Sequence, residues 1–185
     1  MCVSKLRVMH MRVSHGYSLI ELVVIIVVLA VALTGVTLAI NQVVRQSPEA
    51  LVQSRAMELA QTYMDEIITK RFDENSGQGG IPRCDSTDNA AVACSGTLGP
   101  DTGEPSRQQY DDVDDYHNLT ETPPVSIVTA APLNPVYDGY QIHVDVSYAG
   151  TELGMTNNQF AKRITISITT PLGNVLPVSA YRVNF

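Results

Sequence analysis

Basic residues are scarce in this sequence, and their scarcity limits the partners of the protein. The 185 residues contain 12 lysines and arginines against 19 aspartates and glutamates, for a net charge of −7. Lys5, Arg7 and Arg12 lie in the first 16 positions, so the rest of the chain holds 9 basic against 19 acidic side chains, a balance of −10. A chain of this charge is repelled by phosphate backbones. We therefore expect no nucleic acid among its direct partners.

Cysteine and histidine are too sparse for the usual metal and catalytic sites. Nine residues separate Cys84 from Cys94, which does not fit a structural zinc site, and no second His/Cys pair lies nearby to complete four ligands. No nucleophile motif or phosphate loop accompanies His117 or His143. We interpret both as surface histidines and predict that the protein is not an enzyme.

The pair Cys84 and Cys94 is better suited to a disulfide. The third cysteine, Cys2, lies in the N-terminal 16 residues, which cleavage of a leader would remove. A bridge between the other two closes a loop of about ten residues and contributes roughly 2–3 kcal/mol in the chain-entropy model. It requires an oxidising compartment such as the bacterial periplasm. Two unpaired thiols are the alternative.

The apolar residues are concentrated near the N-terminus. Residues 22–40 form a run of 19 residues without a charge, close to the ~20 residues with which a helix crosses the hydrocarbon core. A segment that faces lipid must satisfy its backbone internally, which favours a helix. Because the basic residues precede the run, the positive-inside rule places the N-terminus in the cytoplasm and the rest outside. We predict a single-pass membrane protein.

Glu21 is the one charged residue between Tyr17 and Ile40. A carboxylate in a membrane helix costs about 2.5–3.5 kcal/mol at mid-bilayer and by default indicates function. Alternatively, Ser18 and Glu21 form a capping box that satisfies free N–H groups where the helix begins. A cap would tolerate the change to Gln, whereas a functional charge would not.

The residues around Glu21 resemble the class III signal of type IV prepilins. A short polar and basic leader ends at Gly16 and is followed by Tyr17, Ser18, an apolar pair, Glu21 and the apolar run. The resemblance implies that a prepilin peptidase cleaves after Gly16 and that Tyr17, where the family usually has Phe, is N-methylated. It also implies that Glu21 pairs with the new amino group of Tyr17 on a neighbouring subunit. Since an unpaired buried charge is costly, this pair would set the stagger between subunits.

The sequence after the apolar run indicates an α+β, pilin-like fold. Apolar residues recur at three- and four-residue spacing to about Phe72, opposite a polar face. The Ser-Pro-Glu sequence at 47–49 would either begin a second helix or kink one long helix. We expect a long N-terminal helix, membrane-spanning and then amphipathic, to pack on a C-terminal antiparallel sheet. The apolar stripe comprises Val52, Ala56, Leu59, Ala60, Tyr63, Ile67 and Ile68, and the polar face comprises Arg55, Glu58, Gln61, Asp65 and Glu66.

Strands are predicted in the C-terminal third. Apolar and polar residues alternate over 140–148 and 164–169, and 171–174 is typical of a turn into a last strand over 175–183. A shorter strand is predicted over 125–129. The predicted organisation is a leader at 1–16, a transmembrane and filament-core helix at 17–40, an amphipathic helix at 41–72, an acidic, disulfide-stapled loop region at 73–124 and a β-sheet head at 125–185.

The loop region contains four carboxylates within five residues: Asp111, Asp112, Asp114 and Asp115. Hard oxygen ligands on a loop suit calcium. The segment lacks the central Gly and terminal Glu of an EF-hand, and a solvated turn is the alternative. Calcium is the only cofactor that the sequence suggests.

Together these features look most like the minor subunits of type IV pili, in particular those of the mannose-sensitive haemagglutinin (MSHA) pilus. The resemblance implies an inner-membrane protein with a periplasmic C-terminal domain, which later enters a pilus. Its implied partners are the prepilin peptidase, other major and minor pilins and the inner-membrane assembly platform. Two alternatives remain at this point: a minor pseudopilin of a type II secretion system, and a calcium-dependent binding head at a filament tip. A membrane-anchored sensor or enzyme would instead keep its leader.

Overall fold

The protein is described by a computed structural model that covers residue 16 and residues 18–184. The predicted methylation site, Tyr17, and residues 1–15 of the predicted leader lie outside the described residues. By its internal contacts the chain divides into two compact units, residues 1–47 and 48–185. We call the second unit the head.

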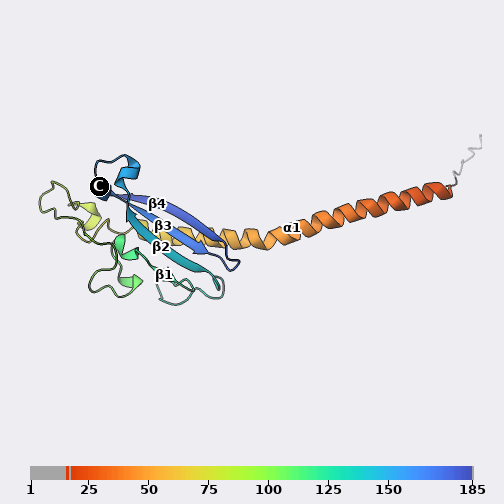
Figure 1. The fold of residues 1–185 in the computed structure, drawn as a ribbon. Coiled ribbons are helices and arrows are strands. Elements are labelled where there is room, and N and C mark those ends of the chain that lie inside the picture. The colour runs from red at the N-terminus through yellow and green to blue at the C-terminus, as the bar shows by residue number, and fades with distance from the viewer. Residues whose placement is uncertain (1–15, 17, 185) are drawn as a thin grey trace, which may run out of the picture. The chain divides into compact units, whose positions relative to one another are not determined.

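Helix α1 (Leu19–Ile68) is the longest element (Figure 1). Its first backbone hydrogen bond runs from the N–H of Leu22 to the carbonyl of Ser18 (3.1 Å). The helical backbone continues through residues 47–49, so no second helix begins there. The helix ends four residues before the predicted Phe72, because the backbone of Arg71 pairs with the acidic loop instead: Val113 N–H donates to the carbonyl of Arg71 (3.0 Å).

Four antiparallel strands form one sheet in the order β1-β2-β3-β4. They are β1 (Thr120–Glu121), β2 (Gln141–Tyr148), β3 (Ala161–Thr169) and β4 (Val175–Val183). The three strands predicted in the C-terminal third are confirmed. Five short 3-10 helices lie in the connections: η1 (Gln78–Gly80), η2 (Arg107–Gln109), η3 (Asp114–Tyr116), η4 (Gly150–Leu153) and η5 (Asn158–Phe160).

The short strand predicted over 125–129 is wrong. Val125 forms one isolated bridge, with Pro132, which has no N–H to extend a ladder. The residues between them turn back, and Ala130 donates its N–H to the carbonyl of Ser126 (2.9 Å). The short strand of the sheet is β1, inside the predicted loop region.

The core of the head lies between α1 and one face of the sheet. Alternate residues of β2 and β3, such as Val144 and Ile166, are paired and fully buried. They pack against Ala56, Leu59, Ala60, Tyr63, Met64 and Ile67 of α1. The predicted stripe is therefore confirmed except at Ile68, which is 38% exposed. This arrangement confirms the predicted α+β, pilin-like fold.

The head has two ends, which the contacts of its helix define. At one end, here called the base, the Tyr140 hydroxyl donates to the carbonyl of Val52 (3.1 Å). At the other, the distal end, the Lys162 ammonium donates to the carbonyl of Phe72 (2.6 Å). The chain enters the head at its base, and the loop containing the disulfide lies at the distal end.

Candidate functional site

The predicted processing site is open to its surroundings. Gly16 is exposed, and a Cβ added to it would have no heavy atom within 4 Å. Glu21 follows in the first turn of α1 and is also exposed. Both residues are therefore accessible to another protein, as a cleavage site and an intersubunit contact would need to be.

The first part of α1, Leu19–Asn41, is long and apolar enough to span a membrane, and none of it is buried in the structure. Its hydroxyls are satisfied locally: Thr34 donates to the carbonyl of Ala30 (2.7 Å) and Thr37 to that of Leu33 (2.5 Å). In hydrocarbon, polar groups need such internal partners. Glu21 is the charged side chain of this span.

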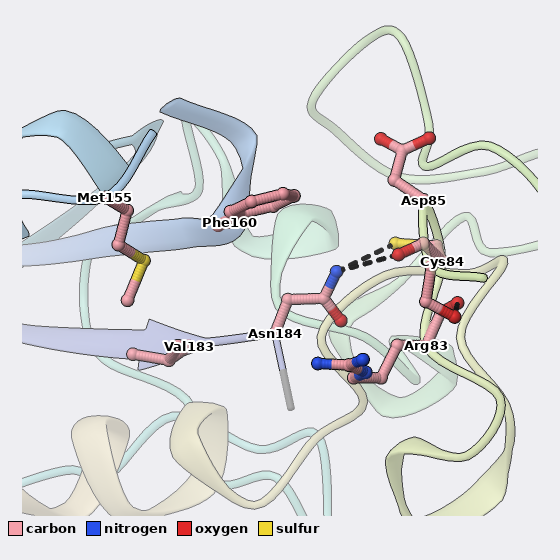
Figure 2. A pocket seen from close by; sticks show the side chains of 8 residues that line it. Arg83, Cys84, Asp85, Met155, Phe160, Val183 and Asn184 are labelled. Carbon is pink, nitrogen blue, oxygen red and sulfur yellow. Dashed lines mark hydrogen bonds between the residues drawn. The ribbon is translucent and has the colours of Figure 1, made fainter. Parts of the chain in front are cut away.

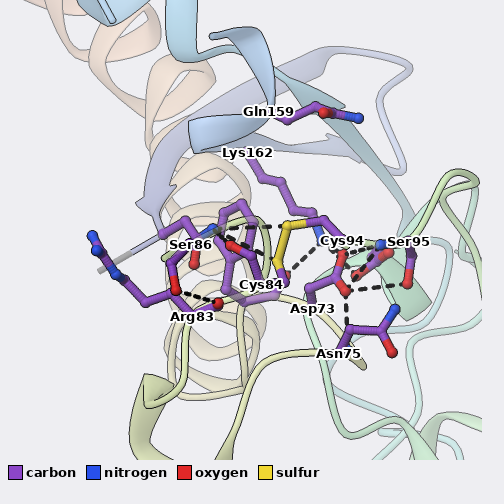
Figure 3. The surroundings of a disulfide bond; sticks show 12 residues. Asp73, Asn75, Arg83, Cys84, Ser86, Cys94, Ser95, Gln159 and Lys162 are labelled. Atoms are coloured by element: carbon purple, nitrogen blue, oxygen red, sulfur yellow. Dashed lines mark hydrogen bonds and ion pairs between the residues drawn. A yellow bond between two sulfur atoms is a disulfide. The ribbon is translucent and has the colours of Figure 1, made fainter. Parts of the chain in front are cut away.

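Cys84 and Cys94 form a disulfide, as predicted. The residue after it, Ser95, donates its N–H (3.0 Å) and its hydroxyl (3.2 Å) to the carboxylate of Asp73. The Tyr148 hydroxyl donates to the carbonyl of Ser95 (2.9 Å). Figure 3 shows Ser95 and Asp73 side by side beneath the sulfur atoms. The bridge thus holds Ser95 where it donates hydrogen bonds to a fully buried carboxylate.

Lys162 is the centre of this distal cluster, which we call the lysine hub. Its side chain is fully buried in β3, and its ammonium contacts Asp114 (2.6 Å) and Asp73 (3.3 Å). It lies over the ring of Phe72 as well, 4.5 Å from the centroid. The hub joins β3, the end of α1 and the acidic loop. A buried charge needs such partners, because an uncompensated one costs several kcal/mol.

A second buried ion cluster, the arginine hub, fastens the loop region to the last turns of α1. Arg107 is 5% exposed and donates to Glu66 of α1 (3.0 Å) and to Glu121 of β1 (3.1 Å). Its guanidinium carbon lies 3.9 Å from the ring centroid of Tyr63. Tyr116 donates its hydroxyl to Glu66 (2.6 Å), and burial raises the pKa of both tyrosines. Glu66 thus faces the loop region and is half-buried, not part of a solvated face.

The acidic run at 111–115 is not a solvated turn. Asp112, Asp114 and Asp115 are each at most 2% exposed. The carboxylate of Asp112 accepts the N–H groups of Asp114 (2.9 Å) and Asp115 (3.2 Å), and so begins η3. Asp111 is half-exposed and pairs with Arg71. Asp115 likewise accepts the N–H groups of Asp111 (2.9 Å) and Asp112 (3.1 Å), so two of the four carboxylates organise the loop itself.

The structure separates the four proposed calcium ligands. Asp114 joins the lysine hub, whereas the other three meet carboxylates from elsewhere in the loop region. In each of two groups the carboxylate oxygens lie within 4.8 Å of one another. The first group is Glu104, Asp111 and Asp115, and the second is Glu74, Asp101 and Asp112.

Two members of these groups hold their protons unusually tightly. Burial, followed by a hydrogen bond with Asp115, raises the pKa of Glu104 to about 7. Burial, followed by a hydrogen bond with Asp114, raises the pKa of Asp112 to about 9. Neighbouring carboxylates of this kind are relieved either by shared protons or by a cation.

A cavity of about 280 Å³ adjoins the disulfide. Figure 2 shows Asn184 reaching across it toward Cys84, whose carbonyl accepts its amide N–H (2.9 Å). Phe160, Met155 and Val183 form its apolar wall, and Arg83 lies on the opposite side.

Sequence reasoning did not identify the buried cations. Lys162 had one signal, because it shares the inward register of β3 with Ile164 and Ile166. Arg107 had none, since its carboxylate partners are 41 and 14 residues away in sequence. His117 accepts the N–H of Val146 (3.3 Å) and lies 3.5 Å from the carboxylate of Asp145, and His143 lies 3.0 Å from the hydroxyl of Thr120.

A family model described as the prokaryotic N-terminal methylation motif matches residues 11–37. This is the segment that contains Gly16, Glu21 and most of the apolar span. The match supports a type IV pilin-like or pseudopilin-like protein, a structural subunit rather than an enzyme, anchored in the membrane by its N-terminus and processed by a prepilin peptidase. No curated protein and no solved structure matches the chain.

Proposed function

We propose that this protein is a minor type IV pilin that is cleaved between Gly16 and Tyr17 and assembled with other pilins into a filament. The observation that carries the proposal is the methylation motif at 11–37, joined to a span whose lone carboxylate is exposed in the first turn of the helix. The head adds an independent argument, because a long helix packed on an antiparallel sheet is the pilin-like arrangement.

Mass spectrometry of the N-terminus tests the processing step. In cells with an active prepilin peptidase, we expect a mature chain that begins at Tyr17 and carries one methyl group on its amine. In cells that lack the peptidase, the chain should begin at Met1. An unprocessed chain in both strains would rule out the pilin assignment and favour a membrane-anchored protein that keeps its leader.

Glu21 tests the assembly step. We propose that it binds the N-terminal amine of a neighbouring subunit, so E21Q should be processed and reach the membrane but lose incorporation into filaments. E49Q, at an exposed carboxylate outside the span, is the matched control. Filaments that contain normal amounts of E21Q would show that Glu21 merely caps the helix.

We propose the MSHA pilus as the assembly and adhesion as its function, because the acidic, disulfide-stapled loop and the acidic run resemble those of its D-type minor subunit. A minor pseudopilin of a type II secretion system would carry the same N-terminal segment. Purification of crosslinked filaments distinguishes the two assemblies. Recovery of pilus subunits with this chain would support the pilus, and recovery of secretion pseudopilins would support the secretion system.

A second candidate, a calcium-dependent head, is favoured by the two carboxylate groups at the distal end. Calcium requires several oxygen ligands, and each group offers three carboxylates. Saturating calcium should then raise the melting temperature of the wild-type head and leave an E104Q/D101N variant unchanged. An identical melting temperature with calcium and with chelator would remove this candidate.

A further inference from the structure

Two loops meet at the base of the head, residues 131–139 and 170–175. Gly139 and Pro171 bring them together: a Cβ on Gly139 would lie 3.3 Å from the side chain of Pro171. Tyr140, at the end of the first loop, donates its hydroxyl to the carbonyl of Val52. The first loop therefore lies beside the first turns of the head's helix, and the second loop lies against the first.

These base loops are apolar and nearly uncharged. Asp138 is the one charged residue among their fifteen. Val136 is 50% exposed, Leu172 59% and Val175 59%, and Leu51 on the adjacent helix is 53% exposed. Large side chains of this kind, left in water at one end of a domain, indicate a surface that another apolar phase covers.

The distal end has the opposite character. Residues 73–118 contain ten acidic and two basic side chains. Four of the acidic side chains are buried, and five are exposed: Glu74, Asp85, Asp88, Asp101 and Asp111. Exposed carboxylates favour water and are repelled by anionic lipid headgroups. Ile81 and Val92 are exposed on the distal loop as well, so the two ends differ in charge: the base is nearly uncharged and the distal end is acidic.

The length of the chain limits how far the base can lie from the bilayer. The membrane span ends at Asn41 and the head begins at Pro48. Seven residues reach at most about 25 Å even when fully extended. Because the chain enters the head at its base, the base is the part of the head that this tether holds nearest the membrane.

We propose that the base of the head docks on the bilayer surface before assembly, with Leu51, Val136, Leu172 and Val175 inserted into the interface. The proposal rests on the membrane anchorage proposed above. Apolar side chains lower their free energy by entering the boundary of headgroups and acyl chains, ~5–10 Å deep. Tyr137, half-buried on the same loop, belongs to the residue type enriched at this depth. Docking would present the acidic distal end to the periplasm.

Tryptophan fluorescence can test this docking cleanly, because the chain contains no tryptophan. The full chain, with L172W as the reporter, is reconstituted into phosphatidylcholine vesicles whose acyl chains are either ordinary or brominated. We expect bromine to reduce the emission by about half at the ~5–10 Å depth of an interfacial residue. V136W, on the other base loop, is a second reporter in case L172W perturbs its turn.

Two further variants separate the possible causes of failure. L153W replaces an exposed leucine of η4 at the distal end, and bromine should leave its emission unchanged. V31W lies in the membrane span and should be quenched strongly. If V31W is not quenched, the membrane anchorage itself fails.

If V31W is quenched while both base reporters emit like L153W, the docking proposal is overturned and the anchorage stands. A blue shift of L172W that is equal in the two lipids and grows with protein concentration would also overturn it. That result would assign the base to contact with a neighbouring subunit.

Discussion

The two halves of α1 both carry many apolar side chains, yet these side chains meet different surroundings. From Leu19 to Asn41 no residue is buried in the structure, whereas after Pro48 six residues of the same helix belong to the core. The first half is apolar on every side, and the second has a stripe three to four residues apart. A helix that is apolar on all sides must be covered by lipid or by other filament subunits, whereas an apolar stripe can be covered by the sheet of the same chain. The head should therefore unfold independently of changes in the span.

The largest effect is expected when the lysine hub loses its cation. K162M leaves Asp73 and Asp114 buried without their counterion, and removal of one partner of a buried pair costs about 3–5 kcal/mol. R163M, one residue along, breaks an exposed pair with Glu152 and should cost less than about 1 kcal/mol. Guanidinium unfolding of the detergent-solubilised full chain, followed by tyrosine fluorescence, measures both. Equal free energies of unfolding for the two variants would show that the lysine hub does not stabilise the head.

The next prediction compares a leucine-to-alanine substitution in each half of α1. L59A removes a side chain that is 1% exposed in the core and should cost about 2–5 kcal/mol of head stability. L33A removes one that is 66% exposed in the span, and the unfolding of the head should not change. A similar loss of stability from both variants would mean that the span and the head unfold as one unit, which would contradict the independence of the two halves.

A smaller loss is expected from the disulfide. Replacement of both cysteines, C84S/C94S, should cost roughly 2–3 kcal/mol and should loosen Ser95 from Asp73. Hydrogen exchange at the N–H of Ser95 is the specific readout, because that group donates to Asp73. The N–H of Val144, in the middle of the sheet, serves as the internal control. Unchanged protection at Ser95 would show that the bridge does not position it.

The last comparison concerns the dependence of head stability on pH. The folded-state pKa of Glu104 is raised to about 7 and that of Asp112 to about 9, so the folded head binds both protons more tightly than the unfolded chain. A raised acid pKa gives stability that is complete below the unfolded value and is lost as the pH rises through the folded one. The melting temperature should therefore fall from about pH 5 to about pH 10.

E104Q tests the assignment of the lower part of this fall. Its amide cannot ionise, so the decrease near pH 7 should disappear while the decrease near pH 9 remains. L33A, a substitution in the span, is the control and should follow the wild-type curve. A curve for E104Q that coincides with that of the wild type would assign the fall to other groups.

Much of the architecture could be predicted from local patterns. The alternation over residues 140–148 indicated β2 because a strand places successive side chains on opposite faces. The spacing of Leu59, Tyr63 and Ile67 indicated the buried stripe for the corresponding helical reason. The strand over 125–129 was predicted on the same basis, and it failed because Pro132 limits its pairing to one bridge.

The loop region could not be predicted in this way, because its structure depends on contacts that are distant in sequence. Glu66 and Glu121 lie 41 and 14 residues from Arg107, and Asp114 lies 48 residues from Lys162. Nothing in the local sequence of Asp111–Asp115 distinguishes a solvated turn from a buried one. Its burial is decided by the cations that the fold brings to it.

By itself, the sequence determined the apolar span, the methylation motif and three of the four strands, because each depends on residues that are near neighbours in the chain. Only the tertiary structure decided what the acidic loop does and which end of the head is nearly uncharged. Electrostatic pairing and surface exposure depend on distances in space, and the antiparallel sheet brings together residues that lie far apart in the sequence. That is why an acidic run that suggested either a calcium site or a solvated turn instead supplies Asp114 as a partner of the buried Lys162.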